Sequence, residues 1–279
     1  MYLSPEEVSE LNINIVPLTV TLHGKSYGQG LDIGAKDFYS LLSETREFPV
    51  TSQPSPGIFV ETYRRLAASD PDILSVHISS GLSGTLNVAQ LAATMVSEAK
   101  INLHDTKTLS AAAGWQAIAA ARALKANWAK DQVIALMKKI SNAAESIFTL
   151  NELRYLAHGG RVSHIKNLLG SVLNIKPIIG VEKVKGTYVQ LSQAWTFEHA
   201  IGELVNHMSH QYSPDISLRV QVVHGQNLEG AQMLRDLVNK RYKCTWLPTC
   251  SVCPVLGAHT GPSVVGIAYA PESIFEGIP

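Results

Sequence analysis

Short apolar runs alternate with amphipathic stretches through the first half of the chain. The runs at 13–24, 73–79 and 101–106 are rich in β-branched or aliphatic residues, which is typical of strands. Between and after these runs, apolar residues recur at helical spacing, at 35–44, 57–69, 86–99 and 109–127. Strands that alternate with helices favour a parallel sheet covered on both faces. We therefore expect an N-terminal α/β domain of three layers.

The alternation changes near residue 146. A strand is predicted at 147–150, and then a helix at 151–160 that Asn151 caps and Gly159 ends with positive φ. A second helix is expected at 163–173, and the segment 174–195 reads as two strands joined by a glycine-containing turn, which favours an antiparallel pair.

The rest of the second half continues this pattern. The remaining predicted elements are helices at about 196–212 and 227–241 and strands at 217–225, 244–249 and 263–270. We therefore expect two domains, an N-terminal α/β domain at 1–146 and a second α/β domain at 147–279 with a mixed, partly antiparallel sheet.

Composition narrows the function classes. The chain has 279 residues, 46% of them hydrophobic, which is enough for a substantial core. Its 23 basic and 23 acidic residues balance and form no block of like charge, so no partner nucleic acid is expected. The first residues carry Glu6, Glu7 and Glu10 where a signal peptide would be basic, and no apolar run reaches membrane-spanning length. We expect a cytoplasmic protein without stable membrane insertion.

Three cysteines lie close together, between residues 244 and 253. Cys250 and Cys253 form a C-x-x-C, but no second pair is present, and the stretch around them has the composition of a strand rather than of a helix N-terminus. On a strand, residues three apart point to opposite faces. We interpret these cysteines as small buried apolar residues.

The segment TSQPSPG, at 51–57, holds more polar side chains than its helix requires. Ser55 before Pro56 supplies the one cap that the following helix needs. Thr51, Ser52 and Gln53 then have no structural task, and they lie where the carboxyl ends of parallel strands bind ligands. We expect them to face a ligand.

The loop SSGLSGT, at 79–85, joins a buried strand to a helix. Its two glycines, Gly81 and Gly84, allow the backbone to approach a ligand, and free N–H groups at a helix start favour an anion. Capping and a tight turn alone would explain one serine and one glycine, whereas the loop has four hydroxyl side chains. The sequence therefore predicts a site for a carboxylate or a phosphate.

Two further loops each contain one candidate residue. Arg161 follows the tight turn Gly159–Gly160 and suits a carboxylate or phosphate, although an exposed arginine after a helix end is an equally ordinary interpretation. His259 lies in GAHTGP, which we expect to be a tight loop before a strand. A histidine in such a loop is usually solvated or locally bonded, so its role stays open.

Other kinds of site lack their signatures. The ten histidines show no metal-binding spacing, and neither G-x-x-x-x-G-K-[ST] nor G-x-G-x-x-G occurs, so we predict no metal and no nucleotide cofactor. GLSGT approaches the G-x-S-x-G of hydrolases but ends in Thr85. A serine hydrolase that uses Ser83 as nucleophile and His259 as base is therefore the alternative hypothesis.

Five segments, taken in order, resemble a known family. They are TSQPS, SSGLSGT, LAHGGRVS, VLNIKPII and CPVLGAHTGPS. Their order and spacing are similar to those of the DegV family of fatty-acid-binding proteins, which includes the FakB subunit of bacterial fatty acid kinase. The resemblance covers nearly the whole chain. It implies a two-domain α/β protein that holds one long-chain fatty acid between its domains and catalyses no reaction alone.

The resemblance also implies roles for residues and partners. In well understood members, the protein presents the fatty-acid carboxyl group to a separate ATP-dependent kinase, and the acyl phosphate enters phospholipid synthesis. Carried over by motif, Thr51 and Ser83 should hold the carboxylate, with Ser80 beside them. Arg161 and His259 should stand at the same polar end, where the kinase approaches.

The sequence departs from the family pattern at both ends. Family members carry a strand and an Asp-Ser turn before the segment that resembles residues 3–18 here, so the resemblance implies a first sheet without that central strand. Near the C-terminus, Cys253, Ala258 and Ser263 replace other small residues of the motif. Because these residues are small, we expect the loop around His259 to be retained.

Overall fold

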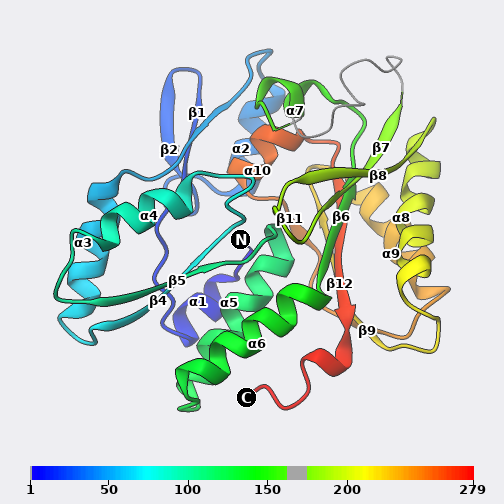
Figure 1. Cartoon of the computed structure of the whole chain (residues 1–279). Coiled ribbons are helices and arrows are strands. Elements are labelled where there is room, and N and C mark those ends of the chain that lie inside the picture. The colour runs from blue at the N-terminus through cyan, green and yellow to red at the C-terminus, as the bar shows by residue number, and fades with distance from the viewer. Residues whose placement is uncertain (1, 162–174) are drawn as a thin grey trace.

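The chain forms a mixed α/β structure of three separate sheets with helices packed on them (Figure 1). The computed structural model describes residues 2–161 and 175–279, and all statements about structure refer to these ranges. A parallel pair of strands lies in the first half of the chain and a mixed sheet in the second half. This confirms the predicted fold class.

The largest sheet has seven strands and belongs to the second half of the chain. Its strands are β6 (Glu145–Thr149), β7 (Lys176–Val181), β8 (Tyr188–Ala194), β9 (Leu218–His224), β10 (Cys244–Trp246), β11 (Cys250–Ser251) and β12 (Val265–Pro271). They lie in the order β10-β9-β12-β6-β7-β8, with β11 beside β9. The pairs of β9 with β10 and β11 are parallel and the others antiparallel, and β7 with β8 is the predicted antiparallel pair.

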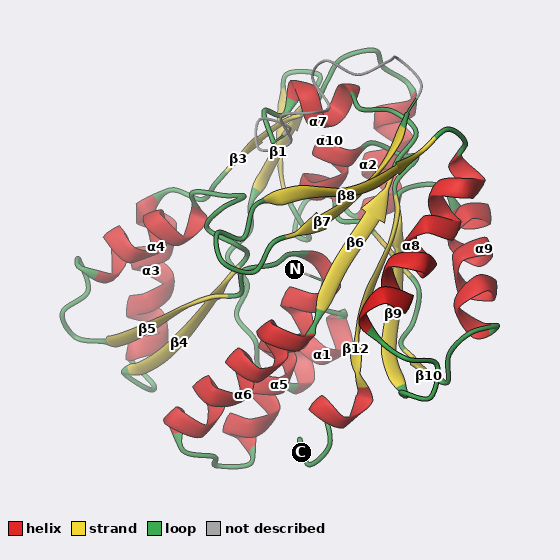
Figure 2. Cartoon of the chain, turned by 45° about the vertical axis from the view of Figure 1, so that its right-hand side comes forward, coloured by secondary structure: helices red, strands yellow, loops and turns green. Residues whose placement is uncertain are grey.

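Helices cover both faces of this sheet (Figure 2). They are α5 (Ser110–Lys125) and α6 (Lys130–Ala143) on one face, and α8 (Phe197–Gln211) and α9 (Leu228–Asn239) on the other. Neighbouring strand residues join different cores: Phe148 and Ile179 pack with α5 and α6, whereas Ile147 and Ile178 pack with α8 and α9. The two-residue period of a strand therefore builds the three layers.

A second unit is built on two parallel strands, β4 (Asp72–His77) and β5 (Lys100–Asp105). The helices α3 (Pro56–Ala67) and α4 (Thr85–Ala93) pack beside them around an apolar cluster that includes Phe59. The cap of α3 is as predicted, because the Ile58 N–H donates to Ser55 Oγ at 3.4 Å and Pro56 opens the helix.

The third sheet is antiparallel, in the order β2-β1-β3, and its strands do not join β4 and β5. It contains β1 (Thr19–Leu22), β2 (Lys25–Gly28) and β3 (Val50–Ser52), with α2 (Ala35–Ser43) packed near it. The run at 13–24 was expected to lie in the parallel sheet, but only its last part is a strand. His23 and Gly24 both have positive φ, 52° and 69°, and such a two-residue turn makes a tight hairpin.

The segment around His259 is a helix, and the prediction of a loop there was wrong. Helix α10 spans Pro254–Thr260, with Cys253 as its N-cap residue and Gly261 after it at φ 73°. Proline in the first turn and glycine after the last favour this helix. A helix N-terminus therefore does follow the C-x-x-C, contrary to the strand composition of this stretch.

Smaller helices depart from prediction in detail. In helix α7 (Arg154–His158) the N-cap position is Leu153 and not Asn151, and it makes no side-chain cap hydrogen bond. The positive φ of 70° belongs to Gly160, whereas Gly159 has φ −70°. A helix α1 (Pro5–Glu10) with a capping box at Ser4 and a short 3-10 helix (Glu272–Ile274) also form. The helix predicted at 163–173 lies outside the described residues.

The helices α5 and α6 precede residue 146 but pack on the sheet that comes after it. Ala120 and Met137 share one apolar cluster with Phe148 and Ile179. The two predicted domains, 1–146 and 147–279, therefore share packed surface, and the position of their boundary stays a prediction.

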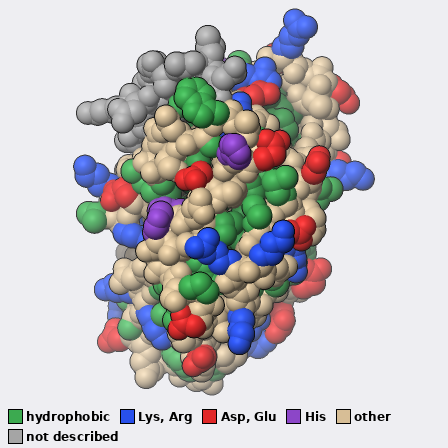
Figure 3. Space-filling view, turned by 90° about the vertical axis from the view of Figure 1, so that its right-hand side faces the viewer, with side chains coloured by type: hydrophobic (Ala, Val, Ile, Leu, Met, Phe, Trp, Pro, Cys, Tyr) green, Lys and Arg blue, Asp and Glu red, His purple; other side chains and the backbone are tan. Residues whose placement is uncertain are grey.

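The surface carries charges of both signs. On the side of α8 and α9, acidic and basic side chains are interspersed with apolar ones (Figure 3). Within the described ranges, no helix has the length and apolar character needed to cross a membrane.

Replacement of one core residue tests the packing of α8. Leu204 is fully buried between α8 and the large sheet, so Leu204→Ala should lower the free energy of unfolding by about 2–5 kcal/mol. Urea unfolding measures this change. The matched control is Leu228→Ala, because Leu228 is 68% exposed and its loss should cost less than about 0.5 kcal/mol. Equal effects of the two variants would contradict the packing.

Candidate functional site

A cavity of about 310 Å³ lies where the three sheets come together, and because its lining includes several polar side chains it is called the polar cavity. Its lining residues are Leu18, Thr51, Ser52, Gln53, Ile78, Leu82, Ser83, Leu109, Arg161, Tyr188, Val255, Leu256 and His259. This set includes most of the residues expected to face a ligand, namely Thr51, Ser52, Gln53, Ser83, Arg161 and His259. The fold therefore brings together side chains that are up to 208 residues apart.

Thr51 and His259 contact each other directly. Thr51 lies in β3, opposite Val20 of β1, so it belongs to a strand and not to a loop. A hydrogen bond of 2.8 Å joins Thr51 Oγ1 to His259 Nε2 on α10. The two residues hold the N-terminal sheet against α10 at the wall of the cavity.

His259 is buried and neutral near pH 7. Burial lowers the pKa of its imidazole to about 4, with the charges of Arg161 and His158 acting in the same direction. Its Nδ1 atom is buried and has no hydrogen-bond partner among the described residues. The backbone of Gly159 lies against this atom, since a Cβ there would overlap with Nδ1. A buried ring nitrogen without a partner is costly.

Ser83 lies in the SSGLSGT loop, directly before α4. Its Oγ is 2.7 Å from Thr85 Oγ1, and the Thr85 N–H donates to it at 3.3 Å. The loop packs on the TSQPS segment, because a Cβ at Gly84 would overlap with Gln53 Oε1. The two hydroxyl-rich segments therefore form one wall of the cavity, as the sequence indicated.

Arg161 brings a positive charge to the cavity. Its Nη1 donates to the Gly159 carbonyl at 2.6 Å, which holds the side chain close to the turn after α7. The remaining guanidinium donors are suited to a planar anion. Within the described part of the lining, Arg161 is the residue that carries a full positive charge, because His259 is neutral.

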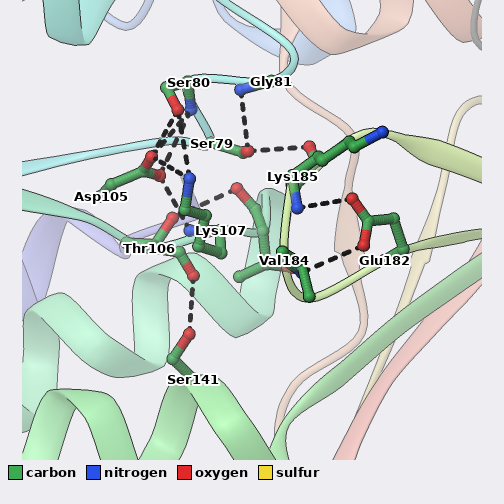
Figure 4. A network of polar contacts seen from close by, with 12 residues as sticks. Ser79, Ser80, Gly81, Asp105, Thr106, Lys107, Ser141, Glu182, Val184 and Lys185 are labelled. Atoms are coloured by element: carbon green, nitrogen blue, oxygen red, sulfur yellow. Dashed lines mark hydrogen bonds and ion pairs between the residues drawn. The ribbon is translucent and has the colours of Figure 1, made fainter.

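Ser80 points elsewhere, into a network below the loop (Figure 4). Its Oγ donates to Asp105 Oδ2 at 2.5 Å, and the Lys107 ammonium pairs with the same carboxylate at 3.0 Å. Burial alone would raise the pKa of Asp105, but the hydrogen bonds from Ser80 and Lys107 outweigh it and hold the pKa below its usual value. Ser80 is not in the described lining of the cavity and supports the loop from beneath.

A second, apolar cavity of about 40 Å³ adjoins the polar one. Apolar side chains from β6, β9 and β12 line it, among them Phe148, Val223, Ile267 and Ala268. Leu109, Tyr188 and Leu256 line both cavities and so lie between them, and these three residues are called the neck. The site thus has a polar end and an apolar end.

The sequence did not point to the residues of the neck. Leu109, Tyr188 and Leu256 lie in three segments that read as ordinary core. Their common position depends on how α5, β8 and α10 pack, which no local pattern reports. A tyrosine at the start of a strand was the only available signal, and strands often contain tyrosine.

The alternative hydrolase hypothesis finds no support in the hydrogen bonds. A serine nucleophile needs a base within about 2.6–3.2 Å. Ser83 pairs with Thr85, and His259 pairs with Thr51. Among the residues that the structure describes, no group of three histidine, cysteine or acidic side chains is arranged to hold a metal ion. The three cysteines are free thiols, and burial raises the pKa of Cys250 to about 12.

Comparison with known sequences gives a match over almost the entire chain. The sequence model described as "Uncharacterised protein, DegV family" matches residues 1–272. A DegV domain-containing protein of Deinococcus radiodurans is 33% identical over 260 residues, which are 93% of this chain and 90% of the relative. A DegV domain-containing protein of Listeria monocytogenes is 32% identical over 269 residues, or 95% and 94% of the two chains.

Solved structures resemble the fold closely. DegV of Bacillus subtilis, described as a fatty acid binding protein, has a TM-score of 0.87 at 26% identity and covers 97% of this chain and 95% of its own. A DegV family protein of Thermus thermophilus, described for its fatty acid binding, has a TM-score of 0.85 at 25% identity and covers 96% and 95%. Both similarities extend over the two halves of the chain.

The electrostatics of His259 can be tested by titration. Its ring should protonate with a midpoint near pH 4 in a heteronuclear NMR experiment, because burial opposes the charged form. Arg161→Gln should raise this midpoint by removing a nearby positive charge, whereas Arg241→Gln, on the exposed surface, should not. Since the folded-state pKa is depressed, the stability contributed by His259 is full above pH 6.5 and is lost as the pH falls towards 4. A midpoint near 6.5 would contradict the burial.

Proposed function

Because the chain belongs to the DegV family, we propose that it binds one long-chain fatty acid, with the carboxylate in the polar cavity and the tail in the apolar one. The observation that carries this proposal is the contact between the two cavities at Leu109, Tyr188 and Leu256. An amphipathic ligand with one anionic end matches a site that is polar at one end and apolar at the other. Fatty acid binding by the similar proteins of Bacillus subtilis and Thermus thermophilus supports it.

The polar cavity offers the groups that a buried carboxylate requires. A carboxylate removed from water is destabilised unless several donors meet it. Thr51 and Ser83 supply hydroxyl groups, and Arg161 supplies the opposite charge. His259 stays neutral and is bonded to Thr51, so its Nε2–H can donate to Thr51 Oγ1 and leave the Thr51 hydroxyl hydrogen for the carboxylate, without adding a charge. Ser80 supports this arrangement through Asp105 and is not proposed as a ligand contact.

The tail supplies most of the affinity. A sixteen-carbon acid has about 14 methylene groups, and burial of each is worth ~0.8 kcal/mol, or ~11 kcal/mol before the cost of association. The apolar cavity supplies an almost wholly apolar lining for such a tail. The lining residues come from both 1–146 and 147–279, which fits a ligand held between the two predicted domains.

The carboxyl group of the bound fatty acid is the group that a partner enzyme would modify. We infer that the protein presents the carboxylate to a separate ATP-dependent kinase, as the family resemblance implies, and does not catalyse the transfer itself. Arg161 is half-buried at the polar end, beside the end of α7, so a partner can approach it. The positive charge that holds the carboxylate is also suited to the phosphoryl group that would be added to it.

Loss of a hydroxyl donor should weaken fatty acid binding. The purified protein should carry one acyl chain, detected by native mass spectrometry. Thr51→Val and Ser83→Ala should each weaken palmitate binding by roughly 10-fold or more in a fluorescence titration, because a hydrogen bond to a charged group is worth about 1.5–3 kcal/mol. Thr245→Val and Ser69→Ala change exposed residues and serve as controls. A lipid-free protein that takes up neither palmitate nor oleate would refute the function.

Arg161 and His259 should affect phosphorylation of the bound fatty acid more than its binding. Arg161→Ala and His259→Ala should reduce acyl-phosphate formation by the fatty acid kinase of the same organism more strongly than they reduce palmitate retention. The rate of acyl-phosphate formation by each variant is compared with that of the wild type at saturating ATP and palmitate, and palmitate retention is measured separately. Unchanged phosphorylation in both variants would show that neither residue serves the transfer.

A further inference from the structure

Tyr188 lies at the junction of the two cavities. It is the first residue of β8 and is 3% exposed, and it lines the polar and the apolar cavity alike. Its ring packs edge-on against Phe148, with centroids 5.4 Å apart. One side chain thus offers an apolar ring and a polar hydroxyl where the chemical character of the site changes.

The turn before Tyr188 is fixed to the loop that carries Ser83 (Figure 4). Ser79 Oγ donates to the Gly186 carbonyl at 2.7 Å, and the Gly81 N–H donates to Ser79 Oγ at 3.1 Å. The two glycines leave no space between the segments, because a Cβ at Gly186 would overlap with Ser79 Oγ. Tyr188, two residues later, is therefore held in a defined position relative to Ser83.

The hydroxyl of Tyr188 is the polar group of a buried side chain that lines both cavities, and buried tyrosine hydroxyls usually find a hydrogen-bond partner. Burial raises the pKa of this phenol, and the nearby charge of Arg161 offsets only part of the effect. The phenol therefore keeps its proton through the physiological range and is a permanent donor.

The surroundings indicate which group this donor meets. Arg161 is the charged residue with the largest effect on the hydroxyl, and Cys253 also lies near it. An acceptor placed between Tyr188 and Arg161 is favoured when it is anionic. We propose that Tyr188 is a further ligand-binding residue, which donates its hydroxyl hydrogen to the carboxylate of the fatty acid. The proposal rests on the proposed function and adds to it a donor that no motif of the sequence contains.

The aromatic ring of Tyr188 contacts the part of the fatty acid next to the carboxylate. With Leu109 and Leu256 it forms the neck through which the first methylene groups pass from the polar to the apolar cavity. A charge-assisted hydrogen bond is about twice as strong as a neutral one. Tyr188 therefore favours free fatty acids over their esters, whose carbonyl carries no charge.

The decisive variant is Tyr188→Phe, which keeps the ring and removes only the hydroxyl. Palmitate binding should weaken by about 10-fold, since a hydrogen bond to a charged group is lost. Binding of methyl palmitate should change much less, and the Tm of the ligand-free protein should not fall. The matched control is Tyr63→Phe, which removes a hydroxyl that bonds Ser75 at 2.9 Å, outside the described lining of both cavities. This control should lower the Tm and leave palmitate affinity unchanged.

Two results for Tyr188→Phe would contradict a role of the hydroxyl in binding the carboxylate. Equal palmitate affinity of wild type and Tyr188→Phe would overturn the proposal, because the hydroxyl would then make no hydrogen bond to the carboxylate. A lower Tm of ligand-free Tyr188→Phe would also overturn it, since the hydroxyl would have a protein partner. Failure of the wild-type protein to bind any fatty acid would instead remove the proposed function, and the role of Tyr188 with it.

Discussion

A hydrogen bond between Thr51 and His259 joins two segments that are 208 residues apart, and the candidate site depends on it. Thr51 is fixed by the pairing of β3 with β1, and His259 by its place on α10. The bond closes one wall of the polar cavity and leaves the opposite nitrogen of the imidazole without a partner among the described residues. Because burial keeps His259 neutral, this wall is polar without a charge of its own, and Arg161 sets the sign of the field in the described part of the cavity.

Local patterns in the sequence predicted most of the helices and strands of the fold, because hydrophobic period and capping residues act within a few positions. Ser55 and Pro56 opened α3 as expected, and the strands around Gly186 paired as expected. The pairing of strands was harder to predict from the sequence. The turn at His23 and Gly24 pairs β1 with β2, so β1 does not join the parallel strands. The helix α10 was missed because His259 and Thr260 lie between Gly257 and Gly261 just before a strand, a pattern that resembles a tight loop.

Some residues of the candidate site could likewise be predicted from the sequence, and others could not. Thr51 and Ser83 stood out because their segments hold more hydroxyl groups than caps require, and both line the cavity. Ser80 lies in the same loop, only three residues before Ser83, yet it faces Asp105 and Lys107. In an irregular loop no period assigns faces, so sequence spacing does not separate a ligand contact from a support. Leu109 and Tyr188 could not be found from the sequence, because only the fold brings these two distant positions to the same cavities.

The contact between Gly81 and Gly186 has a consequence for how the protein varies through evolution. Neither glycine lines the described part of either cavity, yet a side chain at either position would collide with the backbone or hydroxyl of the other segment. A side chain at Gly186 would therefore have to be matched by a change more than 100 residues earlier, at Ser79. The exposed Val184 lies in the same turn and carries no such constraint.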